Sequence, residues 1–180
     1  ALTFHMGGAT SGFVRSPDTT RQHNLDYAQH AADLARKHGL SVGYEAGGLG
    51  DLRFVSDRVD GWGINLDIGH AHMAAGNDEG FFAYFDTFQD LIVEVHHNGV
   101  NHYWGRYMEH QPPHLNNTLD YQHTYERLRD DGYTGPIICE IQGQDIAQVI
   151  RHCQESKEMI SGIWNGALSM KNRWYEAAQP

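Results

Sequence analysis

Short apolar runs alternate with longer stretches of helical periodicity along the chain. The runs predict five β-strands, at residues 2–5, 40–45, 64–68, 91–96 and 137–141. Apolar residues at helical spacing predict helices at about 18–38 (closed by Gly39), 51–59, 79–90, 119–131 and 145–160. In the third of these helices, Phe81, Phe82, Phe85 and Phe88 form a stripe that we interpret as packing against the sheet. Strands that alternate with helices are typical of βαβ units and a parallel sheet.

Each predicted strand has one apolar and one polar face when its residues are separated with a period of two. In the fourth strand, for example, Val93 and Val95 oppose Glu94 and His96. A doubly wound sheet is apolar on both faces, whereas a polar inner face is typical of a (β/α) barrel. We therefore predict an α/β fold of the TIM-barrel type, as a partial barrel of about five βα units with parallel strands. The polar faces end at His5, Glu45, Asp67, His96 and Glu140.

These five strand ends combine three carboxylates with two imidazoles. Converging at one barrel mouth, the carboxylates would repel one another without a cation. Oxygen and nitrogen ligands suit a divalent metal such as Mn²⁺, Mg²⁺, Co²⁺ or Zn²⁺. The segment 67–70 adds a further imidazole, His70, just beyond the third strand, where it would touch a substrate or a further metal.

Composition narrows the class of protein. The chain has 180 residues, of which 40% are hydrophobic, and a net charge of −10, which argues against a nucleic-acid-binding surface. Two cysteines provide no disulfide framework, so we expect a reducing, cytoplasmic setting. No run approaches the length of a membrane span. Because the chain begins inside a predicted strand at Ala1, it is expected to be a fragment or an incomplete barrel.

The segments that carry these residues resemble the xylose isomerase-like TIM-barrel superfamily. That group contains sugar isomerases, ketose 3-epimerases, inosose dehydratases and a metal-dependent apurinic-site endonuclease. The matching segments are 2–7, 42–45, 65–71, 93–96 and 136–141. The Asp-x-x-His-Ala segment and the order Glu, Asp, His, Glu on consecutive strands are fairly specific together. The resemblance covers nearly the whole chain but only the later part of the family's barrel, so the first strands are missing.

The resemblance implies roles for several residues. Glu45, Asp67, His96 and Glu140 would hold one metal. Glu45 and Glu140 would also move protons at the substrate carbon, while the metal stabilises an enediolate. His70 would orient a substrate oxygen, and His5 joins it as a predicted substrate-binding residue.

The segment 98–118 is long for a βα connection, and it departs from the family pattern. Met108 occupies a position where the family has an aspartate. We interpret this segment as a substrate lid in which Arg106 binds a phosphate or hydroxyl cluster, with a packed crossover loop as the alternative. Whether His97, Glu109 or His110 join the site is left open.

The leading hypothesis is a metal-dependent isomerase or epimerase of a small sugar or polyol, phosphorylated or not. The alternatives are an apurinic-site endonuclease-like metal hydrolase and a non-catalytic partial barrel used for binding or assembly. We predict one partial-barrel domain at 1–169 with a tail at 170–180. Because a full barrel has eight strands, we also expect a homo-oligomer that closes the open barrel edges. The expected partner is a small sugar, with neither a nucleic acid nor a membrane.

Overall fold

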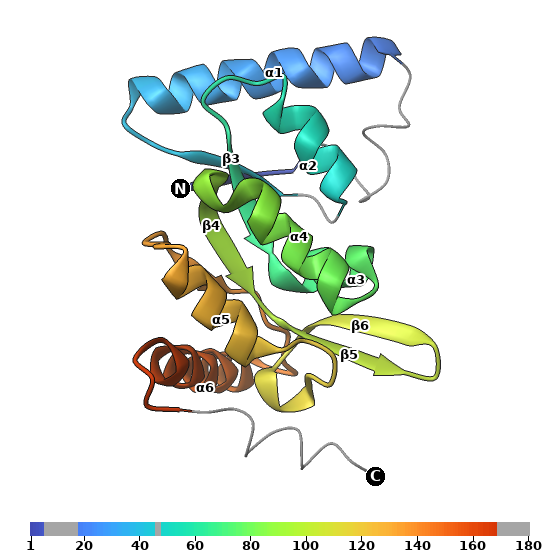
Figure 1. Ribbon diagram of the computed structural model, residues 1–180, viewed down its shortest axis with the longest axis vertical. Helices are drawn as coiled ribbons and strands as arrows, with labels where there is room; N and C mark the ends of the chain where they lie inside the picture. The colour runs from blue at the N-terminus through green and yellow to red at the C-terminus, as the bar shows by residue number, and fades with distance from the viewer. Residues whose placement is uncertain (6–17, 46–47, 169–180) are drawn as a thin grey trace. The chain divides into compact units, whose positions relative to one another are not determined.

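A computed structural model describes residues 1–5, 18–45 and 48–168 of the chain. These residues form two compact units (Figure 1). Of the described residues, the first unit contains those up to residue 96 together with 135–137, and the second contains 97–134 and 138–168. The predicted tail, 170–180, lies outside the described residues. Among the described residues, no helix combines the length and the apolar character needed to span a membrane.

The first unit is built on parallel strands that neighbour one another in chain order. They are β1 (Leu2–Phe4), β2 (Val42–Glu45), β3 (Gly63–Asp67) and β4 (Ile92–His97). The sheet order continues with β7 (Ile137–Cys139) beside β4. All five predicted strands are therefore confirmed, with ends that differ by one or two residues.

Helices follow each of the first three strands in this unit. They are α1 (Asp18–Lys37), α2 (Leu49–Ser56), α3 (Ile68–Ala75) and α4 (Asp78–Phe88), which runs into the 3₁₀ turn η1 (Gln89–Leu91). Gly39 ends the α1 region with a φ of 68°, a conformation that glycine adopts without strain. Helix α3 was not predicted, because it follows β3 without a spacer and its first residue, Ile68, was assigned to the strand.

The core of the first unit lies on the apolar face of the sheet. Val42, Tyr44, Ile64 and Leu66 are buried there. Of the predicted α4 stripe, Phe81, Phe85 and Phe88 are buried and Phe82 is half-buried. Burial of side chains of this size contributes roughly 1.5–3 kcal/mol each.

A β-bulge in β4 changes the phase predicted for one residue. The pairing of β3 with β4 shifts after Ile64, which pairs with Ile92, whereas Asn65 pairs with Glu94. Val93 is the additional residue. A Cβ on Gly63 would lie 2.4 Å from its Cγ1, so Val93 lies on the face that Gly63 shares with Asn65 by alternation. The prediction that Val93 shares the apolar face with Val95 is therefore wrong, because a bulge inserts an extra residue that alternation does not anticipate.

The second unit contains an antiparallel hairpin and two packed helices (Figure 1). Its elements are β5 (Gly99–Tyr103), β6 (Arg106–Gln111), the 3₁₀ turn η2 (Pro113–Leu115), α5 (Tyr121–Asp130) and α6 (Ile146–Trp164). The hairpin occupies most of the segment predicted as a long loop. Its turn is formed by Trp104 and Gly105, both at positive φ, with Trp104 fully exposed. A Trp-Gly pair is not the usual Asn-Gly signal for such a turn, so the sequence did not predict it.

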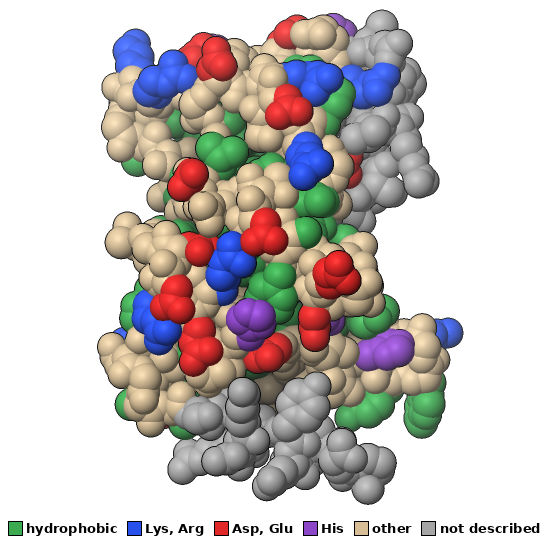
Figure 2. Space-filling view, viewed as in Figure 1, with side chains coloured by type: hydrophobic (Ala, Val, Ile, Leu, Met, Phe, Trp, Pro, Cys, Tyr) green, Lys and Arg blue, Asp and Glu red, His purple; other side chains and the backbone are tan. Residues whose placement is uncertain are grey.

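Charged side chains of both signs are interspersed on the face of the molecule shown in Figure 2. The whole chain carries 23 acidic and 13 basic residues.

Candidate functional site

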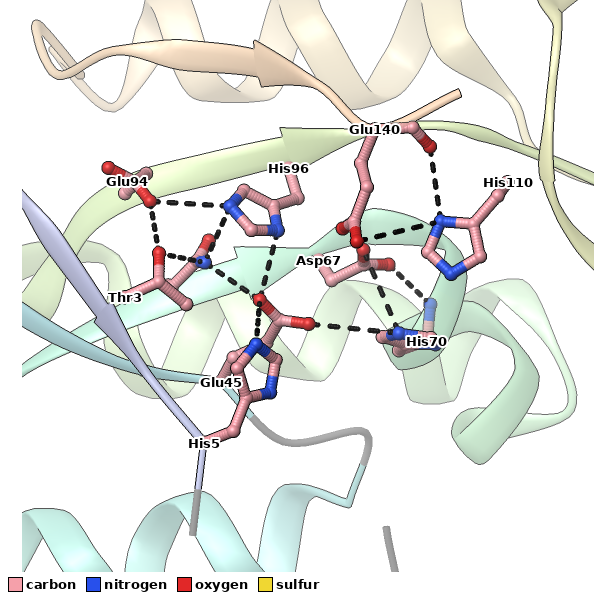
Figure 3. Close-up of polar contacts among 10 residues, drawn as sticks. Thr3, His5, Glu45, Asp67, His70, Glu94, His96, His110 and Glu140 are labelled. Atoms are coloured by element: carbon pink, nitrogen blue, oxygen red, sulfur yellow. Dashed lines mark hydrogen bonds and ion pairs between the residues drawn. The ribbon is translucent and has the colours of Figure 1, made fainter. Parts of the chain in front are cut away.

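The polar ends of the first four strands meet in the first unit (Figure 3). His5 follows β1, Glu45 ends β2, Asp67 ends β3, and His96 lies near the end of β4. Parallel strands that pair in register present their carboxyl ends at the same edge of the sheet, which explains why these residues gather there. The pairing of Asp67 with His96 across β3 and β4 shows this directly.

Glu45 is the centre of this group. Its Oε2 lies 2.9 Å from His96 Nδ1 and 3.6 Å from His5 Nε2, and its Oε1 lies 3.7 Å from His70 Nε2. The Glu45 side chain is only 2% exposed, whereas His5 is largely exposed. Three imidazoles therefore surround one buried carboxylate, as the dashed lines in Figure 3 show.

These surroundings set the protonation state of Glu45. Burial on its own raises the pKa of this carboxyl group. The hydrogen bond with His96 and the charge of that ring act in the opposite direction and outweigh burial, and His5 and His70 add to this effect. The pKa of Glu45 is therefore lowered, and the group is a carboxylate at neutral pH.

Asp67 and His70 are held together by the start of helix α3. Asp67 is both the last residue of β3 and the N-cap of α3, where its Oδ1 accepts a hydrogen bond of 2.7 Å from the backbone N–H of His70. The second oxygen, Oδ2, lies 4.0 Å from His70 Nε2. The three-residue spacing of Asp67 and His70 is thus the spacing of a helix cap, which places the carboxylate and the imidazole side by side.

Asn65 ties the strands together on the polar face. Its amide nitrogen lies 2.9 Å from Thr3 Oγ1, from Glu45 Oε2 and from His96 Nε2. Gly43, on the neighbouring strand, leaves the space that this arrangement needs, because a Cβ there would lie 2.8 Å from the backbone nitrogen of Asn65. The amide therefore holds Glu45 and His96 in fixed positions.

Thr3 and Glu94 are members of the network that were not selected from the sequence. The Thr3 hydroxyl donates a hydrogen bond to Glu94 Oε1, and that oxygen lies 3.3 Å from His96 Nε2. Glu94 is buried, so His96 lies between two buried carboxylates. Strand phase places both residues on the polar face, and that signal could have identified them.

Glu140 and Arg106 belong to the second unit. Glu140 directly follows β7, its backbone N–H donates to the His97 carbonyl at 2.9 Å, and its side chain is 46% exposed. His110 Nδ1 lies 3.1 Å from the Glu140 carbonyl oxygen and 4.0 Å from Oε1 (Figure 3). Arg106 is exposed at the start of β6. The roles of both residues stay predictions.

The sequence left open whether His97, Glu109 and His110 belong to the site, and the structure places them in different surroundings. His97 is fully buried among Tyr121 and Tyr125, with Nδ1 2.5 Å from the Tyr125 hydroxyl. Burial lowers the pKa of His97 to about 3, so the ring is a neutral part of the core. His110 contacts Glu140, and Glu109 offers a carboxylate oxygen within 4.8 Å of a His110 ring nitrogen.

The ligands available in the first unit fit a divalent metal. Glu45 and Asp67 have side chains that are 2% and 0% exposed, and buried carboxylates need a compensating charge. The groups that surround Glu45 are imidazoles, which compensate it only when they are protonated. Carboxylate oxygen and imidazole nitrogen are ligands that Mg²⁺, Mn²⁺, Co²⁺ or Zn²⁺ accept.

Comparison with known protein families agrees with this architecture. The profile of the xylose isomerase-like TIM barrel family matches residues 1–160, so the chain belongs to that family. The predicted resemblance and the predicted fold class are both confirmed: the fold is α/β, of the TIM-barrel type, with five strands in its sheet. A search of curated proteins found no match.

Three solved structures illustrate the likeness. A D-tagatose 3-epimerase-like protein has a TM-score of 0.68 and 20% identity, over 93% of this chain and 64% of its own. A xylose isomerase-like TIM barrel protein from Mycobacterium smegmatis, in complex with magnesium, has a TM-score of 0.70 and 19% identity, over 93% and 61%. The 3-keto-D-glucoside 4-epimerase from E. coli has a TM-score of 0.61 and 24% identity, over 82% and 55%.

These likenesses concern the fold, because the identities are low. The chain spans less than two thirds of the length of each of the three structures, 64%, 61% and 55%.

Proposed function

We propose that this chain carries the site of a metal-dependent isomerase or epimerase of a small sugar or polyol, phosphorylated or not. The observation that supports the proposal best is the buried Glu45 carboxylate, which lies among three imidazoles at the strand ends. Two of the similar structures are described as epimerases or epimerase-like proteins. Isomerases and epimerases of this kind need a base beside an activated carbonyl group, and Glu45 is deprotonated at neutral pH.

Glu45, Asp67 and His96 would hold the metal, with Glu140 as the fourth ligand. Glu140 is included because it follows β7, the next strand in the sheet order after β4. A divalent metal bound by these residues would polarise the substrate carbonyl group. The sequence and the donor set leave Mn²⁺, Mg²⁺, Co²⁺ and Zn²⁺ as candidates, and a magnesium complex is known for one similar structure.

The remaining residues would bind and orient the substrate. Glu45 and Glu140 would remove and return a proton at the carbon next to the carbonyl group, which is the step that passes through an enediolate. His70 and His5 flank Glu45 at 3.7 and 3.6 Å and can donate hydrogen bonds to substrate oxygens. Arg106, which is exposed on the hairpin, would bind a hydroxyl cluster or a phosphate.

Solvent exchange tests the proton transfer. The chain, loaded with each candidate metal, is incubated with D-tagatose and other ketohexoses in D₂O. We expect deuterium on the carbon next to the carbonyl group, together with the epimer or aldose product, detected by NMR. Glu140→Gln should abolish both, while Glu158→Gln, an exposed glutamate on α6, should leave them unchanged. Absence of exchange with every metal and sugar, or full exchange by Glu140→Gln, would contradict the proposal.

We also propose that the chain self-associates through the edges of its sheet. In the described residues, β1 and β7 each have one neighbouring strand, and exposed strand edges pair readily with other chains. Sedimentation of the purified chain at micromolar concentration tests this proposal. A dimer or larger species is expected, and a folded monomer would refute it.

A further inference from the structure

A second group of metal-ligating side chains lies within the second unit. His114 belongs to η2, and His152 and Glu155 belong to α6, which packs against η2. The spacing of three residues places His152 and Glu155 on the same side of the helix. Two short segments that are far apart in the chain therefore bring two imidazoles and one carboxylate together.

The distances among these three groups fit a shared ion better than direct hydrogen bonds. Glu155 Oε2 lies 3.5 Å from His152 Nδ1 and 3.7 Å from His114 Nδ1. Charge-assisted hydrogen bonds are shorter, at about 2.7–2.9 Å. Neighbouring ligand atoms around a tetrahedral zinc ion, bound at about 2.0–2.1 Å, are about 3.3–3.4 Å apart. The observed separations are therefore close to those of a metal centre.

The distance between the two imidazoles and the orientation of their rings also agree with a shared metal ion. One ligand atom from each of the three residues lies within 4.8 Å of the others. The rings of His114 and His152 are 5.1 Å apart and tilted by 43°, so neither ring is stacked on the other. The side chains of His114 and Glu155 are exposed, so both can adjust their rotamers around a shared ion.

One ligand of this group is buried and the other two are exposed to solvent. The His152 side chain is 7% exposed, and it lies beside the buried Ser156 on α6. The side chains of His114 and Glu155 are 39% and 51% exposed. The buried imidazole is held by packing, whereas the open side leaves room for a water molecule as the fourth ligand.

We propose that His114, His152 and Glu155 form a second metal site, specific for a borderline divalent ion of the Zn²⁺ class. Two imidazoles and a carboxylate are a known ligand set for zinc with an open fourth position. The oxygen-rich set around Glu45 suits harder ions as well, so the two sites differ in ligand preference. A metal at the second site would join the segment after the hairpin to α6 and restrict its movement.

Cobalt binding tests this proposal independently of the first site. The full chain carrying Glu45→Gln and Asp67→Asn is stripped with a chelator and titrated with Co²⁺, whose visible absorption reports tetrahedral or five-coordinate binding. We expect one Co²⁺ per chain, displaced by Zn²⁺. In this background, His114→Gln or Glu155→Gln should weaken binding by more than about 100-fold, since even loss of an outer partner costs about 10–100-fold.

Matched controls separate metal binding from folding. His123→Gln on α5 and Glu158→Gln on α6 change exposed residues of the same types in the same unit, and should leave Co²⁺ binding unchanged. His114 and Glu155 are exposed enough to be replaced without loss of the core, which circular dichroism of each variant would verify. Absence of Co²⁺ binding in the background protein, or equal binding by the His114 and Glu155 variants, would overturn the proposal.

Discussion

The bulge that turns Val93 toward the polar face of the sheet makes a sharp prediction about Gly63. A Cβ at Gly63 would lie 2.4 Å from Val93 Cγ1 and 2.7 Å from Cγ2. Ordinary contact between carbon atoms is about 3.5–4.0 Å, so Gly63→Ala would force an overlap of about 1 Å. Such overpacking typically costs about 1–3 kcal/mol of unfolding free energy.

Removing the two Val93 methyl groups should relieve this overlap. We therefore expect Gly63→Ala and Val93→Ala each to destabilise the chain, and the double variant to be more stable than the sum of the two effects implies. The coupling energy should be about 1–2 kcal/mol, because residues in direct contact couple whereas distant ones add within about 0.5 kcal/mol.

Urea unfolding of the four proteins, followed by circular dichroism, measures this coupling. Val95→Ala provides the matched control, since Val95 is buried on the opposite, apolar face and should not couple to Gly63→Ala. Additive effects of Gly63→Ala and Val93→Ala would refute the reasoning, and would place Val93 on the apolar face as simple alternation predicts.

Three further predictions concern other positions. Gly43→Ala should lower the unfolding free energy by about 1–3 kcal/mol, because its Cβ would clash with Asn65. Gly50→Ala should raise it by up to about 1 kcal/mol, because a Cβ at this position in α2 meets nothing within 4 Å. Denaturant titration of both variants measures the sign of each change. Burial holds His97 neutral, with a pKa of about 3, while the unfolded chain takes up this proton below about pH 6.5. The unfolding free energy should thus fall by about 2 kcal/mol between about pH 7 and about pH 5. His97→Gln should lack this pH-dependent fall. An NMR titration in which the His97 ring of the folded chain protonates near its ordinary pKa would disprove the prediction. Asp67→Asn should lower the metal content of the purified chain, measured by elemental analysis against the unaltered protein, and equal content would show that Asp67 is not a ligand.

The alternation of apolar and polar residues along the strands predicted most of the candidate site. Apolar and polar residues alternate clearly in β2 and β3, so the polar ends Glu45 and Asp67 could be placed on one edge of the sheet. The same argument favoured His96 over its neighbour, and the structure places His96 2.9 Å from Glu45 while His97 is buried in the other unit's core. Alternation of apolar and polar residues predicts the facing of a side chain where the strand pairs with its neighbours without a bulge.

The sequence failed where local geometry departs from regular periodicity. The bulge at Val93 adds one residue to β4, which no hydrophobic pattern reveals. The hairpin turns at Trp104 and Gly105, and Trp104 has a positive φ that bulky residues seldom adopt. Helix α3 begins directly at the end of β3, so its first apolar residue, Ile68, reads as part of the strand. The grouping of His114 with His152 depends on tertiary packing, because 38 positions separate them in the chain.

The direct passage from β3 into α3 has a consequence for how the length of this chain can vary. Each inserted residue would turn the start of a helix by about 100° and shift it by about 1.5 Å. An insertion between Asp67 and His70 would therefore rotate the imidazole away from Glu45 and remove the cap at the same time. A deletion there would rotate the imidazole in the opposite direction and would also remove the cap. The segment 67–70 is a unit of fixed length, and it could be transferred between relatives only as a whole.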